Sequence, residues 1–171
     1  MRILMLLRGP LDNDSRVKKE IQSLTQSGHE VFIVSVNSKN VNNIYNYVHK
    51  WDAKRRVFPG ISAILSFFSF LLFSLNKYKD HRVIHCHDLN TLPTAVLIKF
   101  LNFKKKIDIV YDSHELAIND VPNEKKIKKA YKFIIELFFI RFCKKVICVG
   151  NLIGQKYSQL YKIELPSIIL N

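Results

Sequence analysis

Residues 83–116, VIHCHDLNTLPTAVLIKFLNFKKKIDIVYDSHEL, decide the fold of this chain. Short apolar runs at 82–86 and 106–111 have the composition of buried strands. Residues 91–103 between them predict a helix, with Pro93 in the first turn, where proline is favourable. A strand, a helix and a second strand in this order form a right-handed crossover between two parallel strands.

Each of these two strands ends in a cluster of polar side chains. The clusters are His85-Cys86-His87-Asp88 and Asp112-Ser113-His114-Glu115. Ligands of parallel α/β sheets bind outside the carboxyl ends of the strands. Two titratable clusters at one edge of a sheet therefore predict a binding or catalytic site there.

The rest of the chain continues the alternation of strands and helices. An apolar run at 2–7, a break at Gly9-Pro10, candidate N-caps at 12–15 and a terminating Gly28 predict a strand followed by a helix. We expect further strands at 31–36, 44–48, 145–149 and 167–170, and further helices at 61–75, 124–142 and 154–160. This order predicts an α/β fold: one domain with a Rossmann-like, doubly wound parallel sheet.

The composition indicates a globular protein that favours anionic partners. Of the 171 residues, 48% are hydrophobic, and 27 lysines and arginines against 14 acids give a formal charge of +13. Such a balance favours phosphorylated substrates, acidic lipid surfaces or nucleic acid. The three cysteines are odd in number and form no C-x-x-C pair, which is typical of free thiols in a reducing compartment. We therefore expect a cytoplasmic protein.

Two segments suggest an anionic membrane surface as a partner. The expected place of contact is the inner membrane face. The apolar stretch 61–75 is shorter than the roughly 20 residues of a spanning helix. Helix 124–142 begins with several lysines and continues with aliphatic and aromatic residues, a pattern that fits a helix lying on a membrane. A core-packing helix with a solvated basic end is the alternative. No nucleic-acid reading motif is found, so we expect no nucleic-acid partner.

The loop after the first strand is a candidate anion site. Gly9 lets a ligand approach the backbone, the following helix presents free N–H groups, and Arg16 can pair with a phosphate. The loop has neither a G-x-G-x-x-G pattern nor a Walker motif, so a dinucleotide or nucleoside triphosphate site is not expected. An ordinary turn with a capped helix is the alternative.

The first polar cluster leaves three interpretations open. His85 and His87 share one face of a strand and Cys86 points to the other, because side chains alternate along a strand. The cluster can bind a metal, hold buried histidines at the sheet edge, or contact a substrate through His87 and Asp88. No further ligand set at metal spacing appears in the sequence, so we expect no metal site.

The second polar cluster supplies the candidate catalytic residue, His114. An imidazole titrates near neutrality, so His114 can hold a substrate hydroxyl or share developing charge, and Glu115 can orient it or act as a base. No G-x-S-x-G elbow accompanies it, so the sequence does not support a hydrolase triad. An ordinary loop is the alternative.

Several motifs together resemble those of the GT-B glycosyltransferases of family 4. They are DSRV at 14–17 with GHEV at 28–31, VIHCHDLN at 83–90, VYDSHEL at 110–116, KVICVGN at 145–151 and IILN at 168–171. The motifs occur in the family's order and cover essentially the whole chain. The resemblance implies a Rossmann-like N-terminal domain, the half of a two-domain enzyme that mainly binds the acceptor.

The resemblance also implies a reaction. The family transfers a sugar from a nucleotide sugar with retention of configuration and needs no metal ion or other cofactor. His114 matches the active-site histidine that touches the donor sugar, and Gly9 lies in the loop that faces the diphosphate and acceptor. His87 and Asp88 match no specific role. The implied pathway is synthesis of surface polysaccharide or of a glycan linked to a lipid, with a lipid- or glycan-type acceptor.

The sequence departs from the family in one respect. It ends at Asn171, before the half that binds the nucleotide sugar, and its glutamates form no E-x7-E pattern. We expect a fragment, a truncated gene product, or a half that pairs with a separate donor-binding chain, with little turnover by the isolated chain. The alternative function is a non-catalytic Rossmann-like subunit that recruits a catalytic partner to the membrane. The sequence identifies neither donor sugar, acceptor nor oligomeric state.

Overall fold

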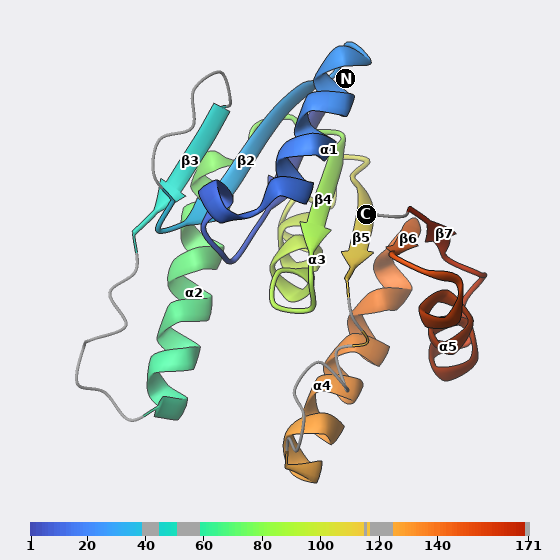
Figure 1. Cartoon of the computed structure of the whole chain (residues 1–171). Coiled ribbons are helices and arrows are strands. Elements are labelled where there is room, and N and C mark those ends of the chain that lie inside the picture. Colours follow the sequence, from blue (N-terminus) through green and yellow to red (C-terminus); the bar gives the residue numbers. More distant parts are fainter. Residues whose placement is uncertain (39–44, 51–58, 115, 117–124, 170–171) are drawn as a thin grey trace.

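A computed structural model of the chain describes residues 1–38, 45–50, 59–114, 116 and 125–169 (Figure 1). The strands are β1 (Arg2–Leu6), β2 (Glu30–Val36), β3 (Tyr45–His49), β4 (Val83–His87), β5 (Asp108–Ser113), β6 (Lys145–Cys148) and β7 (Ser167–Ile168). The helices are α1 (Ser15–Gln26), α2 (Pro59–Lys77), α3 (Leu92–Leu101), α4 (Lys126–Phe139) and α5 (Asn151–Tyr161), with short 3₁₀ turns at Leu11–Asn13 and Ile140–Phe142.

The described strands form one sheet in the order β3-β2-β1-β4-β5-β6-β7, and every pair in it is parallel. The order reverses between β1 and β4, since β1 leads to β2 on one side and β4 leads to β5 on the other. Such a reversal leaves a crevice at the carboxyl ends of the two central strands. The predicted α/β class with a Rossmann-like parallel sheet is confirmed.

Helices cover both faces of the sheet, so the central strands are buried on both sides (Figure 1). Ile3 and Met5 of β1 pack with α1 on one face, whereas Leu4 and Leu6 face the core formed with α2, α3 and α5. This explains why the central strands are continuous apolar runs and do not alternate with polar residues. The polar residues of β4 and β5 interrupt this pattern on the α1 face.

The last helix begins earlier than its sequence pattern predicts. We expected it to start near Gly154, but α5 starts at Asn151, with Gly150 as its extended N-cap. Gly154 lies inside this helix, and a Cβ atom there would lie 2.8 Å from the Cδ1 atom of Ile168. The missing side chain of Gly154 therefore lets β7 approach α5.

The two segments expected to contact a membrane form α2 and α4. Both helices extend past the carboxyl edge of the sheet (Figure 1). No helix in the described part of the chain combines the length and apolarity needed to cross a bilayer. Of the cysteines, Cys86 and Cys148 are buried, Cys143 is half-buried, and all three are free thiols, as expected.

Candidate active site

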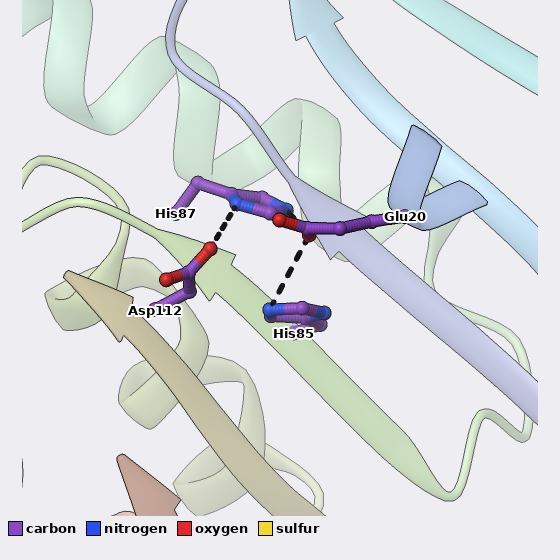
Figure 2. A group of neighbouring side chains, drawn as sticks. All are labelled: Glu20, His85, His87 and Asp112. Carbon is purple, nitrogen blue, oxygen red and sulfur yellow. Dashed lines mark ion pairs between the residues drawn. The ribbon is translucent and has the colours of Figure 1, made fainter. Parts of the chain in front are cut away.

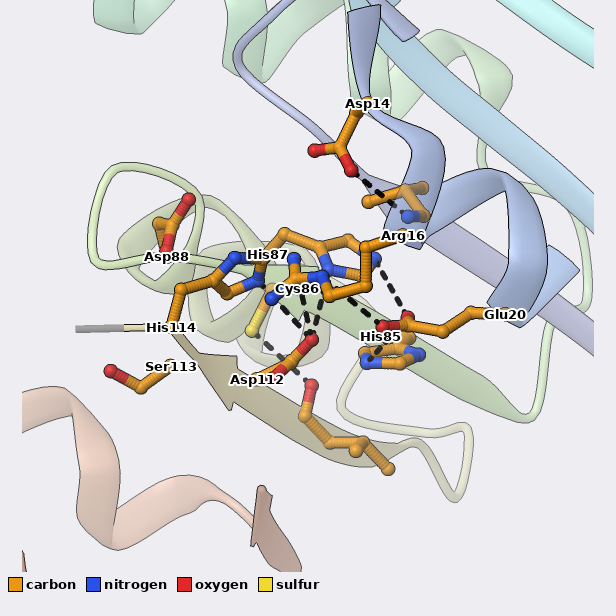
Figure 3. Close-up of polar contacts among 12 residues, drawn as sticks. Asp14, Arg16, Glu20, His85, Cys86, His87, Asp88, Asp112, Ser113 and His114 are labelled. Carbon is orange, nitrogen blue, oxygen red and sulfur yellow. Dashed lines mark hydrogen bonds and ion pairs between the residues drawn. The ribbon is translucent and has the colours of Figure 1, made fainter. Parts of the chain in front are cut away.

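A cluster of ionisable side chains fills the crevice where the strand order reverses (Figure 3). It brings together α1, β4, β5 and the residue that follows β5. Its members are Arg16, Glu20, His85, His87, Asp112 and His114. We call these six residues the buried ionic cluster, because even the two most exposed side chains, those of His114 at 22% and Glu20 at 21%, are mostly enclosed.

Strand alternation places two histidines of β4 in the cluster. The rings of His85 and His87 stack with their centroids 4.5 Å apart and their planes 27° from parallel. Cys86 between them faces the other side of the sheet, where its Sγ atom donates to the carbonyl oxygen of Val110 at 3.4 Å. The predicted arrangement, with both histidines on one face and the cysteine opposite, is confirmed.

Asp112 of β5 is the centre of the cluster. Its Oδ2 atom lies 3.3 Å from Nδ1 of His87 and 3.3 Å from Nε2 of His114. The same oxygen lies 3.7 Å from Nη2 of Arg16. One carboxylate oxygen that is almost inaccessible to solvent therefore faces three nitrogen atoms from three parts of the chain.

Glu20 of α1 closes the cluster from the other side (Figure 2). Its Oε2 atom lies 3.8 Å from Nε2 of His87 and 4.0 Å from Nε2 of His85. Its Oε1 atom lies 3.5 Å from Nε of Arg16, one helical turn earlier. The ring of His87 thus lies between two carboxylates, with Nδ1 toward Asp112 and Nε2 toward Glu20.

Burial and mutual charge set the ionisation of the cluster. Burial raises the pKa of Glu20 to about 7, although His87 and Arg16 oppose the increase. Burial also lowers the pKa of His85 to about 3, with a further contribution from His87. For Asp112, burial acts to raise the pKa, but His87, Arg16 and His85 together hold it below its usual range. Near neutral pH the cluster therefore combines an ionised Asp112 with a Glu20 that is partly protonated.

The cluster also contains the residue types of a metal site. Glu20, His85, His87 and Asp112 each offer a ligand atom, and these atoms lie within 4.8 Å of one another. The lone pair of an imidazole nitrogen lies in the plane of the ring, and the stacked rings of His85 and His87, with planes 27° from parallel, do not aim their lone pairs at one point. Arg16 already brings a positive charge to both carboxylates. The geometry therefore fits ion pairs better than it fits a metal.

Asp88 occupies a conformation that few residues adopt. Its φ angle is 61°, in the left-handed region, and its backbone N–H donates to the carbonyl oxygen of Asp112 at 2.9 Å. Burial raises the pKa of its side chain to about 6. Strained backbone at a strand end is common at functional sites. The turn directs the chain away from β4 and along the edge of two cavities.

Four of the predicted site residues line these two cavities. The smaller cavity, of about 280 Å³, is lined by Gly9, His87 and Asp88 among others. The larger cavity, of about 1000 Å³, is lined by Asp88 and His114. Arg8, Asp88 and Asn90 line both, so the two cavities meet at these residues.

Two predicted site residues are placed differently. The Arg16 side chain is directed to Glu20 and Asp112 and lines neither cavity, so its predicted phosphate contact stays a prediction that this geometry does not favour. Glu115 lies outside the described residues. Sequence reasoning missed Glu20, whose signal is its spacing of four residues from Arg16 on the face of α1 that meets the strand ends.

The larger cavity has apolar walls and a basic rim. Its walls include Ile64 and Phe68 of α2 and Tyr131 and Ile135 of α4, and its cations are Arg8, Lys128 and Lys132. Both helices carry an exposed apolar stripe beside it. The stripes are Ile61, Ile64, Leu65, Phe68 and Leu72 on α2, and Ile127, Tyr131, Ile134 and Phe138 on α4. The cavity can therefore accommodate an apolar chain that carries an anionic group.

A family model places this architecture among known proteins. The model of Glycosyltransferase Family 4 matches residues 16–169, which is most of the chain. No curated protein sequence matches the chain.

Solved structures share the fold at low sequence identity. The catalytic domain of starch synthase IV from Arabidopsis thaliana, bound to ADP and acarbose, matches with a TM-score of 0.65 and 12% identity over 100% of this chain and 51% of that one. HepE from Anabaena, in complex with UDP and glucose, matches with a TM-score of 0.64 and 11% identity over 98% and 44%. UDP-GlcNAc 2-epimerase from Methanocaldococcus jannaschii matches with a TM-score of 0.59 and 15% identity over 99% and 45%. The chain spans about half the length of these structures.

Proposed function

Because this chain belongs to Glycosyltransferase Family 4, we propose that it forms the acceptor-binding half of an enzyme that transfers a sugar from a nucleotide sugar. In this proposal residues 1–171 form a single Rossmann-like domain, and a donor-binding unit, in the same polypeptide or in a partner chain, completes the site. Solved neighbours crystallised with ADP or UDP support a nucleotide-sugar donor. Retention of configuration and independence of metal ions and other cofactors follow from the family resemblance and are part of the proposal.

The single observation that carries the proposal is the position of His114. It lines the larger cavity while its Nε2 atom is held at 3.3 Å from Asp112. A side chain that is fixed on one side and open to a cavity on the other is suited to contact a substrate. We propose that His114 contacts the transferred sugar and that Gly9, His87, Asp88 and Glu115 contribute to binding around it.

The larger cavity supports a lipid-linked acceptor. Its apolar walls suit a hydrocarbon chain, and Arg8 and Lys128 suit a phosphate group at the end of that chain. The exposed stripes on α2 and α4 and the lysines at 125–132 support contact with an anionic membrane. We therefore propose a peripheral enzyme at the inner membrane face that acts in the synthesis of surface polysaccharide or lipid-linked glycan.

The test is binding of polyprenyl phosphate by the 171-residue chain. Binding to vesicles that contain polyprenyl phosphate is compared with binding to vesicles in which phosphatidylglycerol supplies the same charge. We expect tighter binding to the former, and we expect Phe68→Ser to remove the difference. Leu72→Ser is the matched control, because Leu72 is exposed on the same stripe but does not line the cavity.

Two outcomes would overturn parts of the proposal. Equal binding to both vesicle types would reject the lipid phosphate acceptor. Incubation of the chain with labelled nucleotide sugars and polyprenyl phosphate should give no transfer, because the donor-binding unit is missing from the reaction. Robust transfer by the chain alone would reject its role as one half of a site.

A non-catalytic assembly subunit is the second candidate function. The exposed apolar stripes on α2 and α4 favour it, since such surfaces also bind proteins. A complete enzyme would separate the two candidates, because a pure assembly subunit would tolerate His114→Ala without loss of sugar transfer.

A further inference from the structure

Asp112 and His114 come from the end of β5 and the residue after it, and they meet at the border between the buried ionic cluster and the larger cavity. We propose that Asp112 is a positioning residue that holds His114 with its proton on Nε2, so that Nδ1 remains as a hydrogen-bond acceptor for a hydroxyl group of a bound sugar. The part that concerns the sugar rests on the proposed function. The part that concerns the proton does not.

The first step of the argument is the chemistry of the contact. An ionised carboxylate oxygen repels the lone pair of a bare nitrogen, so at ion-pair distance it favours the proton on the nearer ring nitrogen, even where the contact lacks the alignment of a hydrogen bond. The Nε2 atom of His114 lies 3.3 Å from Oδ2 of Asp112, and Asp112 is only 2% exposed. Ionised Asp112 therefore selects the Nε2–H form of His114. A neutral imidazole has one N–H and one bare nitrogen, so Nδ1 is the bare one.

The second step is why Asp112 stays ionised although it is buried. His87 faces the same Oδ2 atom with Nδ1 at 3.3 Å, and Arg16 faces it with Nη2 at 3.7 Å. These positive or proton-bearing groups, with His85, hold the pKa of Asp112 below its usual range against the effect of burial. On the other side of the ring, Nε2 of His87 faces Oε2 of Glu20 at 3.8 Å.

The third step is that the two carboxylates contact different histidines. Glu20 contacts His85 and His87 but does not contact His114, whereas Asp112 contacts His87 and His114. Removing the charge of Glu20 should therefore change His85 and His87 and leave the tautomer of His114 intact. Removing the charge of Asp112 should change His114 directly. The structure thus predicts different effects for two acids of the same cluster.

The fourth step is what the cavity receives. His114 has a 22% exposed side chain and lines the larger cavity. A bare Nδ1 accepts a hydrogen bond and cannot donate one, so it favours a ligand hydroxyl over a ligand carbonyl or phosphate oxygen. The Nε2–H tautomer therefore favours a sugar hydroxyl over a carbonyl or phosphate oxygen at the site that we propose for the sugar.

The test is a long-range ¹H–¹⁵N correlation spectrum of the full 171-residue chain labelled at its six histidines, which reports the proton on each ring nitrogen. His114→Asn assigns the signals of His114. In the unmodified chain near neutral pH we expect His114 with its proton on Nε2. In Asp112→Asn the amide can present its NH₂ group to the ring, so we expect a mixture in which Nδ1–H becomes substantial.

Asp108→Asn is the matched control. Asp108 lies on the same face of β5, four residues earlier, and pairs with Lys144 at 2.6 Å, away from the cluster. We expect its spectrum to show His114 unchanged, and we expect Glu20→Gln to alter the signals of His85 and His87 but not those of His114. A spectrum of the unmodified chain with His114 protonated on Nδ1 would overturn the proposal, and this result does not depend on whether any variant folds. A folded Asp112→Asn with an unchanged His114 would also overturn it.

The ligand part has its own readout. The chain is titrated with free glucose, chosen as a simple sugar, and with inorganic phosphate at the same concentration. A selective shift of the His114 Nδ1 signal with glucose supports the hydroxyl contact, and an equal or larger shift with phosphate overturns it. If the tautomer is as expected but binding of polyprenyl phosphate fails, the positioning role of Asp112 stands and the proposed acceptor is rejected.

Discussion

The ring of His87 bridges Glu20 and Asp112, with 3.8 Å between its Nε2 atom and Oε2 of Glu20 and 3.3 Å between its Nδ1 atom and Oδ2 of Asp112. This bridge links α1 to β5 through β4, across the point where the strand order reverses. The three groups are buried together, so the charge that each carries depends on the proton held by its neighbour. Stability should therefore depend on pH in ways that point mutations can separate.

Glu20→Gln should stabilise the chain at high pH relative to the unmodified protein. The pKa of Glu20 is about 7 in the folded chain, against an ordinary value of 4.5 in the unfolded chain. Between these two pH values the folded chain therefore binds more protons than the unfolded chain. The unmodified chain therefore loses stability as pH rises from 4.5 to 7, whereas Glu20→Gln has no such loss. Urea unfolding at about pH 5 and about pH 8 measures the difference, which should grow with pH and then remain constant.

Glu30→Gln is the control for Glu20→Gln, because Glu30 is an exposed carboxylate at the start of β2. If the advantage of Glu20→Gln were the same at both pH values, Glu20 would not hold a proton in the folded state.

His85→Gln should have the opposite dependence on pH. The pKa of His85 is lowered from 6.5 to about 3, so the folded chain binds fewer protons than the unfolded chain between these values. The unmodified chain therefore loses stability as pH falls from 6.5 toward 3, and a glutamine removes that loss. The comparison is best made in a Glu20→Gln background, since Glu20 titrates in an overlapping range. A midpoint of acid unfolding that does not move to lower pH would contradict the prediction.

Much of the fold was predictable from local sequence. The central strands are apolar runs between turn residues, and the αL residue Gly28 with φ 79° follows α1 as expected from its sequence. The meeting of β4 and β5 follows from the strand–helix–strand order of 83–116 and the handedness of such crossovers. These features depend on neighbours in sequence, which a pattern can show.

The second carboxylate of the site was not predictable in this way. Glu20 lies far from His85 and His87 in sequence, and its role depends on how α1 crosses the sheet. On its own helix, Glu20 looks like the ordinary partner of Arg16, one turn away. Only the packing of α1 against β4 shows that its other oxygen faces the two histidines.

The side of α4 that packs was also not predictable. Phe133 and Leu137 pack against the core, whereas Ile127, Tyr131, Ile134 and Phe138 form a second apolar stripe that is exposed. The sequence shows apolar residues on both sides and does not rank them. The two alternatives expected for this helix, core packing and surface contact, are therefore compatible, since each uses a different stripe.

Tyr161→Phe should destabilise the chain by about 1.5–3 kcal/mol, the usual cost of a lost hydrogen bond to a charged group. The Tyr161 hydroxyl donates to Oε2 of the fully buried Glu136 at 2.5 Å, joining α5 to α4. Tyr111 and Tyr157 donate to Oε1 of the same carboxylate at 2.6 and 2.5 Å. Tyr131→Phe is the control, because Tyr131 is an exposed tyrosine of α4. Equal unfolding free energies for the two variants would show that the hydroxyl contributes nothing.

Replacing Lys125, Lys126, Lys128 and Lys129 by Gln should weaken binding to anionic vesicles. Each lysine near a membrane surface contributes about 1 kcal/mol, so the combined loss should exceed a hundredfold in affinity. The control replaces Lys79, Lys104, Lys106 and Lys145, which precede β4 and β5 or begin β6 and so lie at the opposite edge of the sheet. Both variants lose the same charge. If they bind equally, the start of α4 is not the membrane-facing surface.

His114→Ala should reduce sugar transfer by the complete enzyme at least about tenfold, which corresponds to about 1.4 kcal/mol of transition-state stabilisation. The reason is geometric: Asp112 holds the ring at 3.3 Å, and the ring lines the larger cavity where we place the transferred sugar. His29→Ala is the control, since His29 lies in the turn before β2, at the other edge of the sheet. The measurement is the initial rate at saturating and at limiting donor. A drop in kcat indicates a contact made in the transition state, and a rise in KM alone indicates a contact that binds donor and transition state equally. A rate equal to that of His29→Ala would remove His114 from the site.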